Sequence, residues 1–178
     1  MEEPDPQAVH AAAAGDVEAF ERIVRTYQAP VWRFLCHQVG DVHLAQDLTQ
    51  ETFVRAYRRL DTFRFESKFT TWLYRIARNI AVDALRERTR RTALAARVVP
   101  ARLDEGPELS SEVAAAVLTL SPKLREALLL VEVVGLSCAE AGAVLGIPDG
   151  TVKSRLFLAR RQLVSWFQAG EEEVARDV

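Results

Sequence analysis

The chain has 178 residues, of which 49% are hydrophobic and 27% are charged, and its formal net charge is −2. This length and composition fit an ordinary soluble protein of one domain or two small ones, and no apolar run approaches the ~20 residues that a membrane span needs. A charge so close to neutral excludes a global basic field, so any affinity for nucleic acid must come from local patches.

The first predicted elements are helical, because only eight glycines occur in the chain and alanine is abundant near its start. A helical pattern covers residues 8–27, and Asp16 is placed to cap its second part. Pro30 fits the first turn of the next helix, where its missing N–H costs nothing. Gly40 and Asp41 are expected to close that helix.

The next predicted helix, residues 43–60, has two distinct faces. An apolar arc that includes Phe53 and Tyr57 is expected to face the core. The opposite face, at spacings of three and four residues, carries Asp47, Gln50, Glu51, Val54 and Arg58. A solvated stripe would explain this face, but the apolar Val54 in its middle suggests a contact surface.

A predicted loop at residues 61–68 is unusually aromatic. It contains Phe63 and Phe65, and Phe69 follows directly. These rings are too many for a merely exposed loop, so each is expected either in the core or on a ligand.

The helix expected at residues 70–88 buries Leu73, Ile76 and Ile80 on one side. Its opposite side carries Arg75, Arg78, Asn79 and Arg86. Aromatics beside cations are typical of proteins that bind single-stranded nucleic acid. A core helix with a solvated basic flank is the alternative for this stretch.

Residues 92–109 interrupt the helical pattern with Pro100, Gly106 and Pro107 and are predicted to be a flexible linker, able to span about 60 Å when extended. Helices are expected to follow from Ser110 and from Ser121, the latter with proline at its first helical position.

Residues 136–163 are predicted to form a helix-turn-helix. Ser137 can cap the first helix, Gly146 supplies a left-handed turn, and Gly142 is small enough for two helices to cross closely. The second helix buries Val152, Leu156, Ala159 and Leu163. Its outward side carries Thr151, Lys153, Ser154, Phe157, Leu158 and Arg161. Such exposed side chains early in a second helix suit reading of the major groove, although a plain helical hairpin is the alternative.

Three segments, in this order, resemble the bacterial RNA polymerase sigma factors of the extracytoplasmic-function (ECF) class: DLTQETFVRAYRRL, FESKFTTWLYRIARNIAVD and GTVKSRLFLARRQL. The resemblance covers about residues 16–163. It implies an all-α fold of two small helical domains joined by a flexible linker. Residues 8–91 would dock on polymerase and recognise and melt the −10 element, 92–109 would be the linker, and 110–168 would read the −35 element.

The resemblance also implies roles for individual residues. The face of Asp47, Gln50, Glu51, Val54 and Arg58 would bind polymerase, with Phe53 as support. The −10 region would be contacted by Phe63, Phe65, Ser67, Phe69, Trp72, Arg75, Arg78, Asn79 and Arg86. The −35 region would be contacted by Thr151, Lys153, Ser154, Arg155, Phe157, Leu158 and Arg161. Leu158 departs from the family, which often has arginine there, so the −35 preference at that position is open.

The function implied is promoter-specific transcription initiation, with core RNA polymerase, promoter DNA and an anti-sigma factor as partners in the cytoplasm, without membrane insertion. No catalytic constellation is evident, and neither an enzyme activity, a cofactor, a metal nor a small-molecule substrate is expected. Cys36 and Cys138 lie far apart without metal-ligand spacing and are expected to be reduced thiols. A helix-turn-helix regulator that acts without docking on polymerase is the main alternative.

Overall fold

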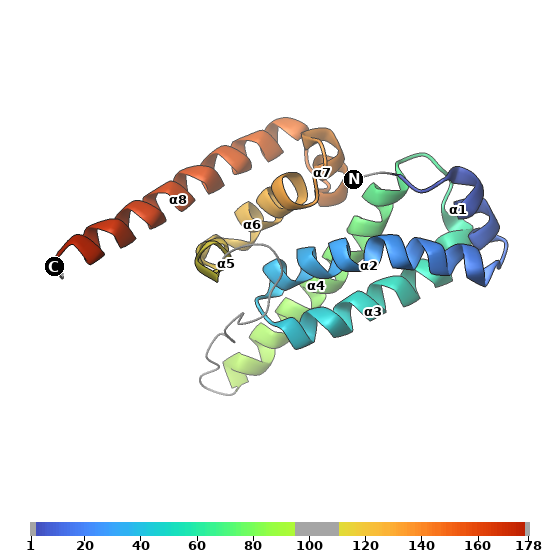
Figure 1. The fold of residues 1–178 in the computed structure, drawn as a ribbon, viewed down its shortest axis with the longest axis horizontal. Coiled ribbons are helices and arrows are strands. Elements are labelled where there is room, and N and C mark those ends of the chain that lie inside the picture. Colours follow the sequence, from blue (N-terminus) through green and yellow to red (C-terminus); the bar gives the residue numbers. More distant parts are fainter. Residues whose placement is uncertain (1–2, 95–110, 177–178) are drawn as a thin grey trace.

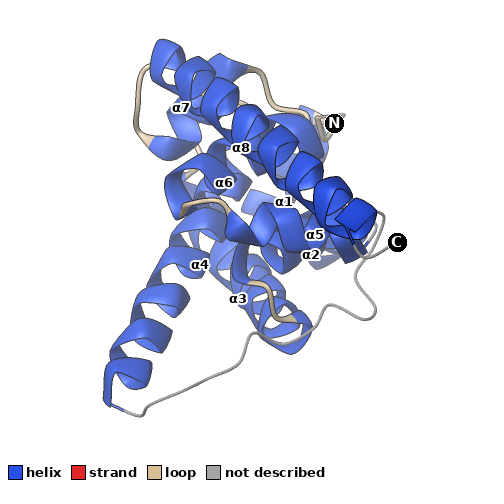
Figure 2. Cartoon of the chain, turned by 90° about the vertical axis from the view of Figure 1, so that its left-hand side faces the viewer, coloured by secondary structure: helices blue, strands red, loops and turns tan. Residues whose placement is uncertain are grey.

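The computed structural model describes residues 3–94 and 111–176, and these residues form helices joined by short loops, without a strand (Figures 1 and 2). The first half contains α1 (Pro6–Ala13), α2 (Val17–Val39), α3 (Val42–Arg59), a 3₁₀ turn (Leu60–Thr62) and α4 (Phe69–Leu94). The second half contains α5 (Ser111–Thr119), α6 (Pro122–Leu128), a π-helical segment (Leu129–Val133), α7 (Cys138–Leu145) and α8 (Asp149–Arg176). The prediction of an all-α fold with a helix-turn-helix in its second half is confirmed.

Helix α2 differs from its prediction, because it runs unbroken through Pro30, where a new helix was expected to begin. Proline inside a helix removes the bond to the carbonyl four residues earlier, here that of Thr26. The buried side nevertheless continues across the proline, from Tyr27 to Val31 and Phe34. Packing of this continuous apolar side against α3 and α4 therefore outweighs the local preference for a break.

The predicted caps of α2 are confirmed. The Asp16 carboxylate accepts a hydrogen bond from the Ala19 amide at 3.0 Å, and Gly40 ends the helix with a φ of +69°. Helix α3 buries two threonines, Thr49 and Thr52, on its core side. Each hydroxyl donates to the carbonyl four residues earlier at 2.7 Å, so neither is left without a partner in the core.

The second half is built around α8, which packs on α6 and α7 and then projects beyond them (Figure 1). Pro122 occupies the first turn of α6, as predicted. The last helix continues to Arg176. Within the described ranges, no helix is both long and apolar enough to cross a membrane.

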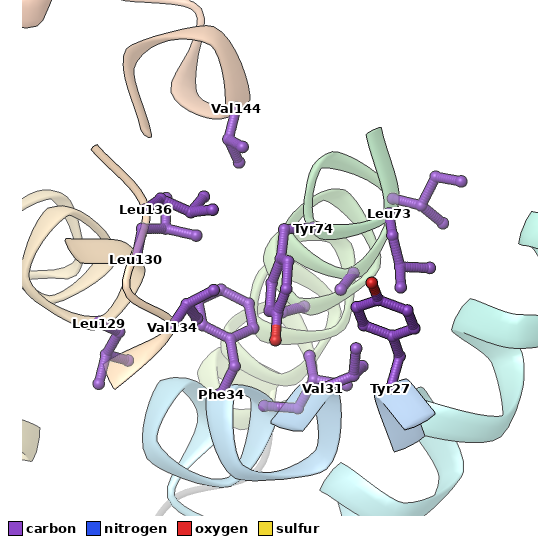
Figure 3. Close-up of a cluster of buried hydrophobic side chains, with 14 of the residues drawn as sticks. Tyr27, Val31, Phe34, Leu73, Tyr74, Leu129, Leu130, Val134, Leu136 and Val144 are labelled. Carbon is purple, nitrogen blue, oxygen red and sulfur yellow. The ribbon is translucent and has the colours of Figure 1, made fainter. Parts of the chain in front are cut away.

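The two halves pack against each other through a shared apolar cluster (Figure 3). Phe34 of α2 and Tyr74 of α4, whose ring centroids lie 5.4 Å apart, face Leu130, Val134 and Leu136 of the second half. All five side chains are buried. The described parts of the two halves therefore share one core.

Polar contacts between the halves add to this packing. Arg125 of the second half donates to the carbonyl of Gln38, near the end of α2, at 3.0 Å. The predicted linker, residues 92–109, lies outside the described residues, except that α4 extends to Leu94.

Candidate nucleic-acid interfaces

The loop between α3 and α4 leads into a compact aromatic cluster. The ring of Phe63 lies 5.8 Å from that of Phe69 and 5.3 Å from that of Trp72, measured between centroids. Phe63 and Phe69 are buried, and Trp72 is partly buried. These three residues form the floor of the loop and offer little ring surface to a ligand in this arrangement.

Phe65 differs from these neighbours, because 41% of its surface is exposed. Its φ of +57° lies in the left-handed region, which costs a residue with a side chain about 1–2 kcal/mol. The ring lies 4.7 Å from Phe63 and is stacked on His10 at 4.2 Å with an interplanar angle of 14°. Backbone strain of this kind concentrates at functional sites. Ser67, in the same loop, is also exposed.

The predicted basic side of α4 is formed, but it is engaged by the second half of the chain. Arg75 donates to the carbonyl of Ala143 at 2.7 Å. Arg78 donates through two nitrogens to the carboxylate of Glu126, at 3.0 and 3.2 Å. The Glu126 side chain is only 5% exposed, so Arg78 supplies the opposite charge for a carboxylate that is largely removed from water. Arg86 is exposed, 4.0 Å from Asp83.

Asn79 is exposed on the same helix. It follows Phe69 by ten residues of helix, a rise of about 15 Å. Arg78 donates to the Asn79 side-chain oxygen at 3.4 Å. Asn79 therefore lies on the basic side of α4, next to Arg78.

The predicted docking face of α3 is accessible. Asp47, Gln50 and Arg58 are exposed, and Val54 is 48% exposed despite its apolar side chain. The partly buried Glu51 pairs with Arg55, a residue that the sequence had not singled out. Phe53 is buried beneath this face, as expected for support. Tyr57 was expected in the core but is 43% exposed, with its ring 4.9 Å from that of Phe20.

The helix-turn-helix consists of α7, a tight turn and α8. Ser137 and Glu140 form a reciprocal capping box at the start of α7, and Gly146 ends the helix with a φ of +68°. A Cβ on Gly142 would lie 2.7 Å from the Ile147 carbonyl oxygen, so any larger residue would force the turn to move.

The outward side of α8 is open to solvent. Val152, Leu156 and Ala159 are buried, as predicted. The −35 candidates on the other side are exposed, except for the partly buried Arg155: Thr151, Lys153, Ser154, Phe157, Leu158 and Arg161.

Two contacts shape this surface. Lys153 pairs with Asp149 at 3.0 Å, which raises the pKa of Lys153 and lowers that of Asp149. Phe157 is 61% exposed, and the Arg161 guanidinium carbon lies 5.8 Å from its ring centroid.

No group of three potential metal-ligating side chains occurs in the part of the chain that the structure describes. Cys36 is buried and unpaired, and burial raises the pKa of its thiol to about 12. A thiol with so high a pKa remains protonated and is a poor nucleophile.

Comparison with known proteins identifies the family. Residues 23–91 match the family described as sigma-70 region 2, and residues 110–163 match sigma-70 region 4. The chain is 35% identical over 166 residues to the ECF RNA polymerase sigma factor SigW of Bacillus subtilis, covering 84% of this chain and 89% of SigW. It belongs to the ECF RNA polymerase sigma factors. The ECF sigma factor SigC of Mycobacterium tuberculosis is 40% identical over 171 residues, covering 90% of this chain and 92% of SigC.

Two solved structures share the fold of this ECF sigma factor. CnrH, in complex with the cytosolic domain of CnrY, superposes with a TM-score of 0.75 at 29% identity, covering 94% of this chain and 99% of CnrH. RpoE of Bartonella quintana, in complex with the anti-sigma factor NepR, has a TM-score of 0.76 at 26% identity, covering 85% of this chain and 98% of RpoE. Membership of this family assigns the chain to promoter-directed transcription initiation by RNA polymerase.

Proposed function

We propose that this ECF sigma factor divides promoter recognition among three surfaces: α3 docks on core RNA polymerase, the loop before α4 captures the −10 element, and α8 reads the −35 element. The observation that carries this proposal is the pattern of exposure within each element. Phe65 is exposed above buried aromatics, and the outward side of α8 is exposed above a buried stripe.

At the −10 element, Phe65 provides the ring on which an unpaired base stacks. Phe63, Phe69 and Trp72 support the loop, and Ser67 offers a hydroxyl at its rim. Extruding a base costs a few kcal/mol, and stacking on an aromatic ring returns about 1–3 kcal/mol. Capture of the base therefore favours the melted promoter without any covalent step.

Along α4, Arg75, Arg78 and Arg86 are assigned to the phosphates of the same strand, with Asn79 as a polar contact farther along the helix. Two of these arginines bind Ala143 and Glu126 of the second half. We therefore expect the halves to separate when the −10 strand binds. The −35 surface of α8 is exposed already, so it does not require this step.

At the −35 element, Lys153, Ser154 and Phe157 are assigned to base edges, and Thr151, Arg155 and Arg161 to the DNA backbone. Leu158 cannot hold a phosphate, but its methyl groups suit contact with the methyl group of thymine.

On α3, the surface of Asp47, Gln50, Glu51, Val54 and Arg58 combines charge with one apolar side chain. This composition suits a polymerase surface of mixed character better than it suits DNA, because acidic side chains repel phosphate.

The proposal includes an anti-sigma factor as regulatory partner, supported by the related structure of RpoE in complex with the anti-sigma factor NepR. It places the protein in the cytoplasm, where polymerase and promoters occur, and assigns it no catalytic activity of its own.

Three single variants test the division of labour: Asp47→Ala, Phe65→Ala and Lys153→Ala. Binding to core polymerase, promoter opening and binding to −35 duplex are measured for each variant. Asp47→Ala should weaken binding to core polymerase, Phe65→Ala should weaken promoter opening, and Lys153→Ala should weaken binding to −35 duplex. Each effect should be roughly tenfold, for a contact worth about 1.4 kcal/mol. Loss of the same step in all three variants would contradict the proposal.

A further inference from the structure

The segment before α2 contacts the loop before α4 at the middle and at the end of that loop. This segment lies outside the region 2 match, which begins at residue 23. Glu3 reaches the start of α4, and His10 of α1 reaches Phe65.

Glu3 acts as the N-terminal cap of α4. Its carboxylate accepts hydrogen bonds from the Phe69 amide at 2.8 Å, from the Thr70 amide at 3.3 Å, and from the Thr70 hydroxyl. The first amides of a helix have no partner within the helix, and the helix dipole favours negative charge there. Glu3 thus fixes a helix that begins 66 residues later in the chain.

The local sequence cannot provide this cap. Lys68 occupies the position before α4, and its carbonyl accepts from the Trp72 amide at 3.2 Å. A lysine side chain has no acceptor for the free amides. Its ammonium points elsewhere and pairs with Glu140 at 2.6 Å. The acceptor that α4 lacks locally is supplied by Glu3.

His10 holds the strained residue of the loop. Its ring is stacked on Phe65, and its Nδ1 lies 2.8 Å from the Pro6 carbonyl oxygen, which fixes the plane of the imidazole. Phe63 contacts Phe65 at 4.7 Å between centroids. A left-handed residue with a side chain persists where its surroundings determine its conformation, and here His10 and Phe63 provide these surroundings.

We propose that Glu3 and His10 are positioning residues for −10 base capture: Glu3 fixes the start of α4, His10 fixes the ring of Phe65, and together they shape the loop before a base arrives. Neither side chain needs to touch DNA. A loop that is already ordered loses less conformational entropy on binding, so capture is faster and tighter. This inference rests on the proposed role of Phe65 in capture.

The test uses the full chain with core polymerase, on a promoter that the wild-type holoenzyme transcribes. A 2-aminopurine at the captured position reports unstacking of the base and gives the rate of promoter opening. The variants are Glu3→Gln, His10→Ala and His10→Phe, and Glu18→Gln, at an exposed glutamate of α2, is the matched control. Affinity for core polymerase and the melting temperature are measured in parallel.

Glu3→Gln and His10→Ala should each slow opening by roughly five- to tenfold, a change typical of losing one charged or stacking contact. Affinity for core polymerase should stay unchanged for both. His10→Phe should restore the rate to within about twofold of wild type, because it keeps the stacked ring. Glu18→Gln should match wild type.

Equal opening rates for wild type, Glu3→Gln and His10→Ala would overturn this inference but would not contradict the proposed function. Parallel losses of core binding and opening, without rescue by His10→Phe, would assign the two residues to general folding and would also overturn it. Failure of the wild-type holoenzyme to open any promoter would contradict the proposed function itself, and the inference with it.

Discussion

Phe65 is the residue at which exposure and backbone strain coincide. Its ring lies at the surface, whereas Phe63 and Phe69, two residues before it and four after it, are buried. The sequence predicts that the loop aromatics are either core or ligand-binding, but it does not separate them. Their orientations depend on a left-handed residue that is not glycine and on a histidine from another helix, and neither has a local signal.

In α8, by contrast, the outward and inward positions follow from helical periodicity. The buried Val152, Leu156 and Ala159 and the exposed Lys153, Ser154 and Phe157 were all predicted correctly. The side of a helix on which each residue lies follows from the helix geometry, so it can be predicted without knowledge of the tertiary structure.

Leu158 offers a test at this scale, because it is 47% exposed beside Phe157. Leu158→Arg should add one phosphate contact, which steepens the dependence of log K on log salt by about 0.9. Fluorescence anisotropy of the full chain on a −35 duplex at several salt concentrations measures this slope. Leu158→Ala is the control and should leave it unchanged. Equal slopes for Leu158→Arg and wild type would place the residue away from DNA.

Helix boundaries were predictable where the signal was local. Asp16, Gly40, Ser137 and Gly146 lie at the expected caps. The prediction that a new helix begins at Pro30 was wrong, because the buried side of α2 continues past the proline and tertiary packing outweighs one lost hydrogen bond. The cap of α4 had no local signal, because it comes from the distant N-terminal segment.

Helix α7 carries a pH-dependent contact. Hydrogen bonds from Lys68 and Ser137 lower the pKa of Glu140 from 4.5 to about 2. A carboxylate with a lowered pKa stabilises the fold above its unfolded pKa and loses that contribution as the pH falls through the folded value. Glu140 therefore contributes fully at neutral pH, and its contribution is lost between about pH 4.5 and pH 2.

Thermal unfolding of Glu140→Gln at several pH values tests this contact. We expect the variant to melt below wild type at pH 7, and the difference to shrink as the pH falls below 4.5 toward 2. The glutamine cannot ionise, so the melting temperature of the variant lacks this contribution to its pH dependence. A difference that stays constant over the whole range would contradict the assigned role of Glu140.

For the whole molecule, the closed packing of the two halves was left open by the sequence. The contacts that create it join residues far apart in the chain, such as Arg125 and Gln38, which are separated by 87 positions. Periodicity and capping report on neighbours along the chain and carry no information about such pairs. The two proposed DNA surfaces differ as a result: Arg75 and Arg78 of the proposed −10 surface contact the second half, whereas the proposed −35 surface of α8 is exposed.

Glu126→Gln should loosen the closed arrangement, because a neutral amide cannot replace the two charge-assisted hydrogen bonds to Arg78. Such bonds are worth about 1.5–3 kcal/mol. Small-angle scattering should show a larger radius of gyration, and binding to single-stranded −10 DNA should strengthen.

The exchanged pair Arg78→Glu with Glu126→Arg provides the control, because it restores the opposite charges and should restore the compact form. An unchanged radius of gyration for Glu126→Gln would show that apolar packing alone holds the halves together.

The most direct test of the central claim is run-off transcription with purified core RNA polymerase and this protein on genomic fragments. We expect transcripts that start at discrete promoters and are absent with core polymerase alone. Phe65→Ala should reduce these transcripts while leaving holoenzyme formation intact. A protein that footprints duplex DNA by itself, yet directs no transcript above the background of core polymerase, would contradict the account.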